Sequence, residues 1–224
     1  RICLAQRQNA LPVPHAMMKR PLTMDDYLNA RLIAEPLRLF DCVMPCAGAE
    51  AFLVMSIERA KSLGLDYVKV MATSERHNAF PDDPVQYRAG WAVDVDDFYG
   101  QAGLGPDDID LMQAYDDYPV ICFMQIEDLG FCGKGDAAKF VRERDLTVER
   151  GSFPFNTSGG QLSTGQAGAG GGYIGVVETL RQLTDQVQGH QVENARHGLA
   201  AFFGMINYDR GLCTSAIILK RADA

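Results

Sequence analysis

Residues 156–172 read NTSGGQLSTGQAGAGGG, and seven of these seventeen residues are glycine. A glycine-rich polar segment is often a flexible linker. The flanks favour an ordered loop, because residues 153–155 are the apolar run FPF and the residues after the loop repeat apolar side chains at the spacing of one helix face: Ile174, Val177, Leu180 and Leu183. A glycine loop that opens a helix presents backbone N–H groups to an anion or a carbonyl oxygen, since glycine lets a ligand approach the main chain. We therefore expect residues 156–172 to form an ordered, ligand-binding loop.

This loop does not fit the common nucleotide motifs. Gly170, Gly172 and Gly175 satisfy GxGxxG, but a dinucleotide fingerprint follows directly on a hydrophobic strand and has an acidic residue about twenty positions later. Here the preceding run is GSFPFNTS, which is short and broken by Pro154. The sequence contains no GxxxxGK[ST]. Nucleotide binding of either kind is therefore not expected.

Charge and hydropathy exclude further classes of protein. The 224 residues carry a formal charge of −8, and no basic stripe of the kind that nucleic-acid binders use is present. The uncharged runs are too short to span a membrane, and the opening RICLAQRQNA is not a signal peptide. We expect a soluble cytoplasmic protein. Since the chain begins with Arg1 and its opening fifty residues show no core of their own, we interpret it as the C-terminal portion of a longer protein.

The cysteines do not show the spacing of a metal site. Six are scattered along the chain, and the pair in DCVMPC, Cys42 and Cys46, has neither a second half nor a nearby histidine. Reduced, buried thiols are favoured over zinc ligands or disulfides. The sequence therefore predicts no metal.

Strand and helix patterns alternate along the chain. A helix is expected after Thr23, another after the small residues that follow Cys46, and a strand over residues 67–75. The further elements are a helix over residues 91–102, a strand over 109–114, a buried helix over 120–131, the helix after the glycine loop, and two strands over 197–208 and 212–221 joined by a DRG turn. This order indicates an α/β architecture that ends in a hairpin.

The order of these segments resembles the C-terminal half of the thiolase superfamily, in particular its sterol-carrier and lipid-transfer-like branch. AGAEA at residues 47–51 is similar to the family's DGAAA box, and LGPDDIDLMQAYDDY at 104–118 resembles the helix start and strand that carry its HDCF or NEAF box. GGQLSTGQAGAGGG at 159–172 resembles the GGxxxxGHPxGxxG loop. The resemblance implies a layered αβαβα thiolase fold. Residues 1–62 would be the end of the N-terminal repeat with part of the loop region, and residues 63–224 the C-terminal repeat. The family's nucleophilic cysteine would lie upstream of Arg1.

The sequence departs from the family at its proton-handling positions. Gln166 stands where the GHP histidine would be, Tyr115 where the HDCF histidine would be, and the closing loop offers Tyr208 in place of a cysteine. The resemblance therefore implies Tyr115, Tyr208 and Gln166 as catalytic residues. The alternative is that the tyrosines are core residues with bonded hydroxyls. HNAF at 77–80 imitates NEAF but follows a different strand, so His77 is interpreted as a solvated loop residue.

Tyrosines in these positions resemble the aldolases of steroid side-chain breakdown, which carry out retro-aldol cleavage on a thiolase scaffold. The resemblance implies a β-hydroxyacyl-CoA with a bulky, steroid-like side chain as substrate, a ketone and a short acyl-CoA such as propionyl-CoA as products, and no cofactor beyond the coenzyme A of the substrate. It also implies a homodimer and a small OB-fold partner of the DUF35 type. The residues expected to contact substrate are Asn156, Gly159, Gly160, Ser163, Tyr118 and Gly204. Two alternatives stay open: an acyltransferase that uses a cysteine outside this chain, and a non-catalytic acyl-CoA-binding subunit.

Overall fold

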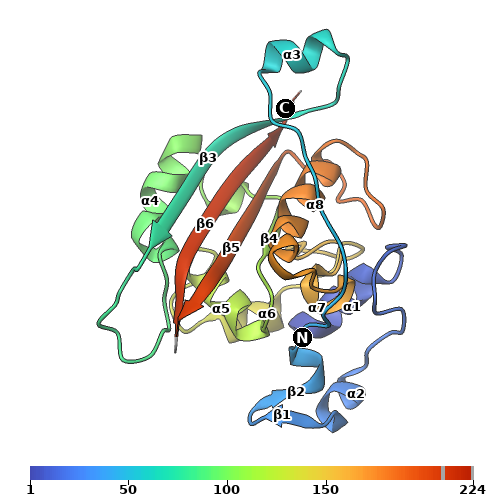
Figure 1. The fold of residues 1–224 in the computed structure, drawn as a ribbon, viewed down its shortest axis with the longest axis vertical. Coiled ribbons are helices and arrows are strands. Elements are labelled where there is room, and N and C mark those ends of the chain that lie inside the picture. The colour runs from blue at the N-terminus through green and yellow to red at the C-terminus, as the bar shows by residue number, and fades with distance from the viewer. Residues whose placement is uncertain (208–209, 223–224) are drawn as a thin grey trace.

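The computed structural model describes residues 1–207 and 210–222, and its centre is a four-stranded mixed sheet (Figure 1). The strand order is β3 (Val68–His77), β6 (Arg210–Arg221), β5 (His197–Asn207) and β4 (Leu111–Ala114). β6 pairs antiparallel with both β3 and β5, whereas β4 runs parallel to β5. The predicted α/β architecture and its C-terminal hairpin are confirmed.

Helices cover both faces of this sheet. α4 (Trp91–Ala102) and α5 (Pro119–Asp128) lie on one face, and α8 (Ile174–Leu183) lies on the other. Successive residues of a strand point to opposite faces. Accordingly Ile218 of β6 packs in the cluster that contains Trp91, whereas the next residue, Leu219, packs with Leu183 of α8. The structure thus shows one sheet between two layers of helices, which is part of the predicted αβαβα arrangement.

The expected elements lie close to their predicted positions. The helix predicted over residues 91–102 is α4, and Thr23 caps α2 (Met24–Asn29) with a capping box. Three α-helices of the described residues were not predicted: α1 (Ile2–Ala10), α6 (Ala137–Glu143) and α7 (Gly160–Thr164), which lies inside the glycine loop. The remaining short elements are β1 (Leu32–Ala34), β2 (Leu37–Arg38), η1 (Leu39–Asp41), α3 (Ile57–Ser62), η2 (Pro106–Asp108) and η3 (Gly168–Tyr173). The boundary proposed between residues 62 and 63 falls at the end of α3 and stays a prediction.

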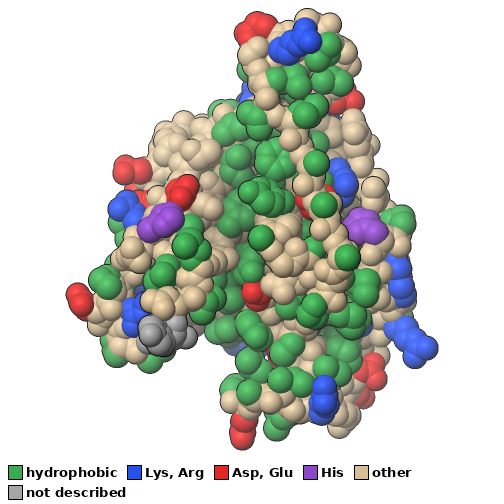
Figure 2. Space-filling model, in the orientation of Figure 1, with side chains coloured by type: hydrophobic (Ala, Val, Ile, Leu, Met, Phe, Trp, Pro, Cys, Tyr) green, Lys and Arg blue, Asp and Glu red, His purple; other side chains and the backbone are tan. Residues whose placement is uncertain are grey.

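An apolar hollow separates the sheet from the segment that leads to α3. Residues 47–56 form neither helix nor strand, and α3 stands away from the sheet (Figure 1). This segment, α8 and β6 line a hollow of about 470 Å³. Figure 2 shows hydrophobic side chains gathered across this part of the surface. Leu53 and Val54 are 78% and 85% exposed, so the segment contributes little to the core.

The glycine loop is ordered, and one carboxylate holds it in place. Asp116, two residues after β4, accepts hydrogen bonds from the backbone N–H groups of Gln161 (2.9 Å) and Leu162 (3.1 Å) at the start of α7. It also accepts one from Nε2 of Gln6 in α1 (2.6 Å). Gly160 has a φ of +59°, and a Cβ there would lie 2.2 Å from Oδ2 of Asp116. Glycine is thus required where the loop meets this carboxylate.

The burial of Asp116 links its ionisation to stability. The carboxyl group is buried, and this desolvation raises its pKa from 3.8 to about 6, against the opposing effect of its three donors. A group with a raised pKa binds more protons in the folded state than in the unfolded state between these two values. The free energy of unfolding therefore falls as pH rises from about 3.8 to about 6 through this group, and it is level above that.

We expect Asp116→Asn to destabilise the full protein by about 1–3 kcal/mol at neutral pH, because an amide cannot accept on both of its terminal atoms and at least one buried donor loses its partner. The variant should also lose the part of the pH slope that Asp116 causes. Urea unfolding at several pH values measures both effects. Asp107→Asn, at an exposed position, is the matched control. Equal stability of Asp116→Asn and the control would contradict the anchoring role.

Candidate functional site

Tyr115 follows β4 directly, and its neighbours fix its position. Its backbone N–H donates to the carbonyl oxygen of Ala201 in β5 (3.0 Å) and to Oε1 of Gln125 in α5 (3.0 Å). Nε2 of Gln125 in turn donates to the Tyr115 carbonyl oxygen (2.7 Å). The half-buried phenol donates to Oδ2 of Asp117 (2.8 Å). The backbone contacts at the end of β4 therefore keep the Tyr115 hydroxyl within hydrogen-bond distance of the Asp117 carboxylate.

Gln166 reaches the same carboxylate from the glycine loop. Its backbone bridges to residues 44–46, with its N–H donating to Met44 (2.8 Å) and its carbonyl accepting from Cys46 (2.9 Å). Its Nε2 donates to Oδ1 of Asp117 (2.6 Å). The structure thus brings two of the predicted catalytic residues, Tyr115 and Gln166, together through Asp117. Sequence reasoning missed Asp117, although the box YDDY contains it.

The surroundings of this group decide its protonation. Burial, and then the bond to Asp117, raise the pKa of Tyr115 well above its ordinary value, while the amides of Gln166 and Gln161 act in the opposite direction. Burial also raises the pKa of Asp117, and the bond from Tyr115 opposes this shift. Near neutral pH Tyr115 is therefore a neutral phenol, which donates to the carboxyl group of Asp117. Asp117 is consequently a stronger proton acceptor than an exposed aspartate.

Gln161 is a second residue that sequence reasoning missed. Its side chain is buried at 2% exposure, its amide contacts the Tyr115 phenol, and its Oε1 has no hydrogen-bond partner among the described residues. Gln161 and Tyr115 line one small cavity of about 10 Å³. A cavity of this size has room for about one water molecule and not for an acyl-CoA. No sequence pattern indicates this contact, because it depends on how α7 packs against the end of β4.

Four of the residues expected to contact substrate make packing contacts within the protein, and their contact with substrate stays a prediction. Asn156 is 1% exposed, and its side chain accepts from the N–H of Ala114 (2.7 Å) and donates to the carbonyl oxygen of the same residue (3.1 Å). Gly159 and Ser163 lie against α1, where a Cβ on Gly159 would come within 2.4 Å of Ala10. Gly160 lies against Asp116. These residues hold the loop and the strand together.

The N–H groups at the start of α7 are also not free. The sequence analysis expected them to face a ligand, but those of Gln161 and Leu162 donate to Asp116. The buried carboxylate of Asp116 thus occupies these two donors. The polar contacts among Tyr115, Asp117 and Gln166 come from side chains.

The other expected site residues lie on open surface or outside the described residues. Tyr118 precedes α5 and is 39% exposed. Gly204 lies in β5, and no atom would be within 4 Å of a Cβ added there. Both positions are open to a ligand. Tyr208 lies outside the described residues. His77 ends β3 and is a strand residue, which corrects its interpretation as part of a loop.

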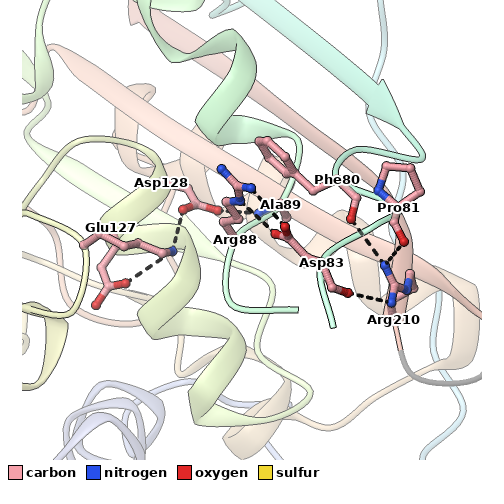
Figure 3. Close-up of polar contacts among 9 residues, drawn as sticks. Phe80, Pro81, Asp83, Arg88, Ala89, Glu127, Asp128 and Arg210 are labelled. Atoms are coloured by element: carbon pink, nitrogen blue, oxygen red, sulfur yellow. Dashed lines mark hydrogen bonds and ion pairs between the residues drawn. The ribbon is translucent and has the colours of Figure 1, made fainter. Parts of the chain in front are cut away.

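Hydrogen bonds attach the start of β6 to the loop between β3 and α4 (Figure 3). Arg210, the first residue of β6, donates to the carbonyl oxygens of Phe80 (3.3 Å), Pro81 (2.8 Å) and Asp83 (3.0 Å). The carboxylate of Asp83 accepts two bonds from Arg88, whose guanidinium lies 3.8 Å from the centre of the Phe80 ring. The loop between β3 and α4 is thereby attached to the base of the hairpin.

Comparisons with known proteins identify the family and the fold of the chain. Residues 72–217 match the family model described as thiolase C-terminal domain-like. A steroid side-chain-cleaving aldolase of Thermomonospora curvata is 34% identical over 81% of this chain and 47% of its own length. A 17-hydroxy-3-oxo-4-pregnene-20-carboxyl-CoA lyase of Mycobacterium tuberculosis is 35% identical over 81% of this chain and 48% of its own.

A solved structure extends the similarity to nearly the whole chain. The Ltp2-ChsH2(DUF35) aldolase superposes with a TM-score of 0.78 at 26% identity, over 98% of this chain and 57% of that one. The chain spans about half the length of the curated relatives it matches. Among the described residues no helix is long and apolar enough to cross a membrane. With the family model covering most of its length, the chain belongs to the thiolase C-terminal domain-like family and has the thiolase fold.

Proposed function

We propose that the complete protein is an aldolase that cleaves a β-hydroxyacyl-CoA with a bulky, steroid-like side chain into a ketone and a short acyl-CoA such as propionyl-CoA. The observation that carries the proposal is the bonded group Tyr115–Asp117–Gln166, which stands where the resemblance places the histidines of thiolytic members. The names of the two relatives support a lyase of this type. Because the chain spans about half of each relative, the activity is that of the whole protein.

The bonded group suggests a path for the first proton. The β-hydroxyl of the substrate gives its proton to the oxygen of Tyr115 as Tyr115 passes its own proton to Oδ2 of Asp117. The Cβ–O bond becomes a carbonyl, and the electron pair of the Cα–Cβ bond stays on Cα as a thioester enolate. A proton donor then protonates Cα, and we assign this role to the phenol of Tyr208. Asp117 releases its proton to solvent and Tyr208 takes one from solvent, which restores both groups and keeps the number of protons unchanged.

Gln166 has a positioning role in this scheme. It offers two amide hydrogens and can also accept, but it cannot act as a base near neutral pH. Its Nε2 binds Asp117 and contacts Tyr115, so it orients the pair before substrate arrives. Positioning of the Tyr115–Asp117 pair is the role that its contacts support.

The proposed assembly of the complete protein rests on its similarity to a solved aldolase. The solved aldolase is a complex with a DUF35 component, and we propose that the complete protein binds a small OB-fold partner of that type and forms a homodimer. We also propose a cytoplasmic location. All six cysteines are free, as is usual in a reducing compartment.

Two substrates, given separately to the full protein, test the reaction class. One is a steroid-like β-hydroxyacyl-CoA alone, and the other is the matching β-ketoacyl-CoA with free CoA. Each is measured with and without the OB-fold partner. We expect only the first to be cleaved, without consumption of CoA, because the site offers a phenol and a carboxylate and no histidine to activate a thiol. Products are followed by mass. Cleavage of the keto substrate alone would place the protein among the thiolases, and full activity of an isolated monomer would contradict the assembly.

Tyr115→Phe should lower kcat by about a hundredfold or more, since a positioned acid–base group contributes about 10²–10⁴. KM should change little, because the phenyl ring keeps its packing. Steady-state kinetics of the full protein measure both. The control is Tyr87→Phe, which removes a hydroxyl from an exposed ring in the loop between β3 and α4, and which should retain kcat. Equal losses in the two variants would remove Tyr115 from the proton path.

Asp117→Asn should lower kcat to a similar extent, because an amide cannot accept the proton of Tyr115. In the unmodified enzyme Asp117 must be ionised to act, and burial raises its pKa above 3.8. Activity should therefore fall as pH falls through a midpoint above 3.8, and the variant should lack this dependence. A pH profile of kcat checks the sign. If kcat of Asp117→Asn falls at low pH in the same way as that of the unmodified enzyme, another group causes the pH dependence.

A further inference from the structure

Three side chains of types that bind transition metals meet on the sheet face opposite α4, where Glu75 and His77 are exposed. Glu75 and His77 are two residues apart on β3, so they point to the same side. Cys213 of β6 is the register partner of His77. Nε2 of His77 lies 2.6 Å from Oε1 of Glu75 and 3.6 Å from Sγ of Cys213. One ligand atom from each residue lies within 4.8 Å of the other two.

The spacing of these atoms suits a tetrahedral ion. Zinc binds thiolate sulfur at about 2.3 Å and imidazole nitrogen or carboxylate oxygen at about 2.0–2.2 Å, which places neighbouring ligand atoms roughly 3.3–3.7 Å apart. The distance of 3.6 Å between the nitrogen and the sulfur already fits. The 2.6 Å contact between His77 and Glu75 must open. Their side chains are 48% and 67% exposed, so they are free to rotate.

The backbone under these side chains is a regular ladder. Cys213 also pairs with Gly204 of β5, so three strands run side by side beneath the site. The intervening residue Arg76 points to the opposite face, where it binds Asp94 of α4. A site on paired strands keeps its ligands in register better than one on a loop. Three protein ligands leave a fourth position for water.

We propose that Glu75, His77 and Cys213 form a binding site for a divalent transition-metal ion, with Zn²⁺ as the ion that the oxygen, nitrogen and sulfur donors fit best. On binding, the Cys213 thiol loses its proton to solvent and a metal–sulfur bond replaces the S–H bond. Burial, and then the charge of Glu75, raise the pKa of this thiol, so the free protein carries it protonated. The ion joins the edge strand β3 to β6.

This site lies apart from the proposed proton-transfer residues, although Cys213 is the register partner of Gly204. Its residues belong to β3 and β6, whereas Tyr115, Asp117 and Gln166 lie beyond β4 and in the glycine loop. The sequence analysis predicted no metal, because Cys213 and His77 are 136 positions apart and neither has a second ligand at a recognised spacing. Only the pairing of β3 with β6 brings them together.

Cobalt provides a direct test. The full protein, treated with a chelator and freed of it, is titrated with Co²⁺, and the near-ultraviolet charge-transfer band of a cobalt–thiolate bond is recorded. We expect one equivalent to produce the band and Zn²⁺ to remove it by displacement. Cys213→Ser should abolish the band, and His77→Asn should weaken binding at least tenfold. Cys46→Ser is the matched control, since Cys46 is also a partly buried free thiol and should leave the band unchanged.

Thermal unfolding gives a second measurement that does not depend on cobalt. Zn²⁺ should raise the Tm of the unmodified protein and of Cys46→Ser but not that of Cys213→Ser, because an ion that binds only the folded state stabilises it. Absence of a thiolate band in the unmodified protein would overturn the proposal. A band that persists in Cys213→Ser would overturn it as well. Should Cys213→Ser fail to fold, the loss or retention of affinity in His77→Asn decides the question.

Discussion

The buried carboxylate of Asp116 is the interaction on which the arrangement of the site depends. It joins the end of β4 to the start of α7 and to α1, three segments far apart in the sequence. A buried carboxylate is costly unless donors satisfy it, and here three N–H groups do so. Its raised pKa shows that the compensation is incomplete. Glycine at position 160 lets the loop approach Oδ2 of Asp116, so the glycine content of the loop is needed for this hydrogen-bonded contact.

Adjacent residues with the same side chain have different roles here. Asp116 is fully buried and holds backbone, whereas Asp117 is partly buried and holds the Tyr115 phenol and the Gln166 amide. The difference follows from direction, because successive side chains at a strand end point to opposite sides. One faces the packed loop and the other faces the phenol. Two adjacent aspartates therefore have two roles: Asp116 anchors the glycine loop, and Asp117 is the proposed proton acceptor.

The glycine loop acts mainly through packing. Gly159 and Gly160 have positive φ angles, and a side chain at either would strike α1 or Asp116. The first backbone donors of α7 are satisfied internally. A loop of this composition thus positions Gln161 and Gln166 beside Tyr115, and these side chains carry the polar contacts of the site. Tyr118 and Gly204, the other described residues expected to contact substrate, are open in this chain.

Local patterns in the sequence determined the main elements: the helix over residues 91–102, the strand ending before Tyr115 and the C-terminal strands all follow from periodicity and from turn residues. The motif order also determined the family and placed Tyr115 and Gln166 at the site. Helix α1 was missed, because its stability comes from packing against α7 rather than from a strong apolar pattern of its own. Only the tertiary structure decided that Asn156, Gly159, Gly160 and Ser163 are packed rather than open, that Asp117 joins the two predicted catalytic residues, and that Cys213 meets His77. Each of these depends on a contact between distant segments, and local sequence carries no information about the distance or direction of such contacts.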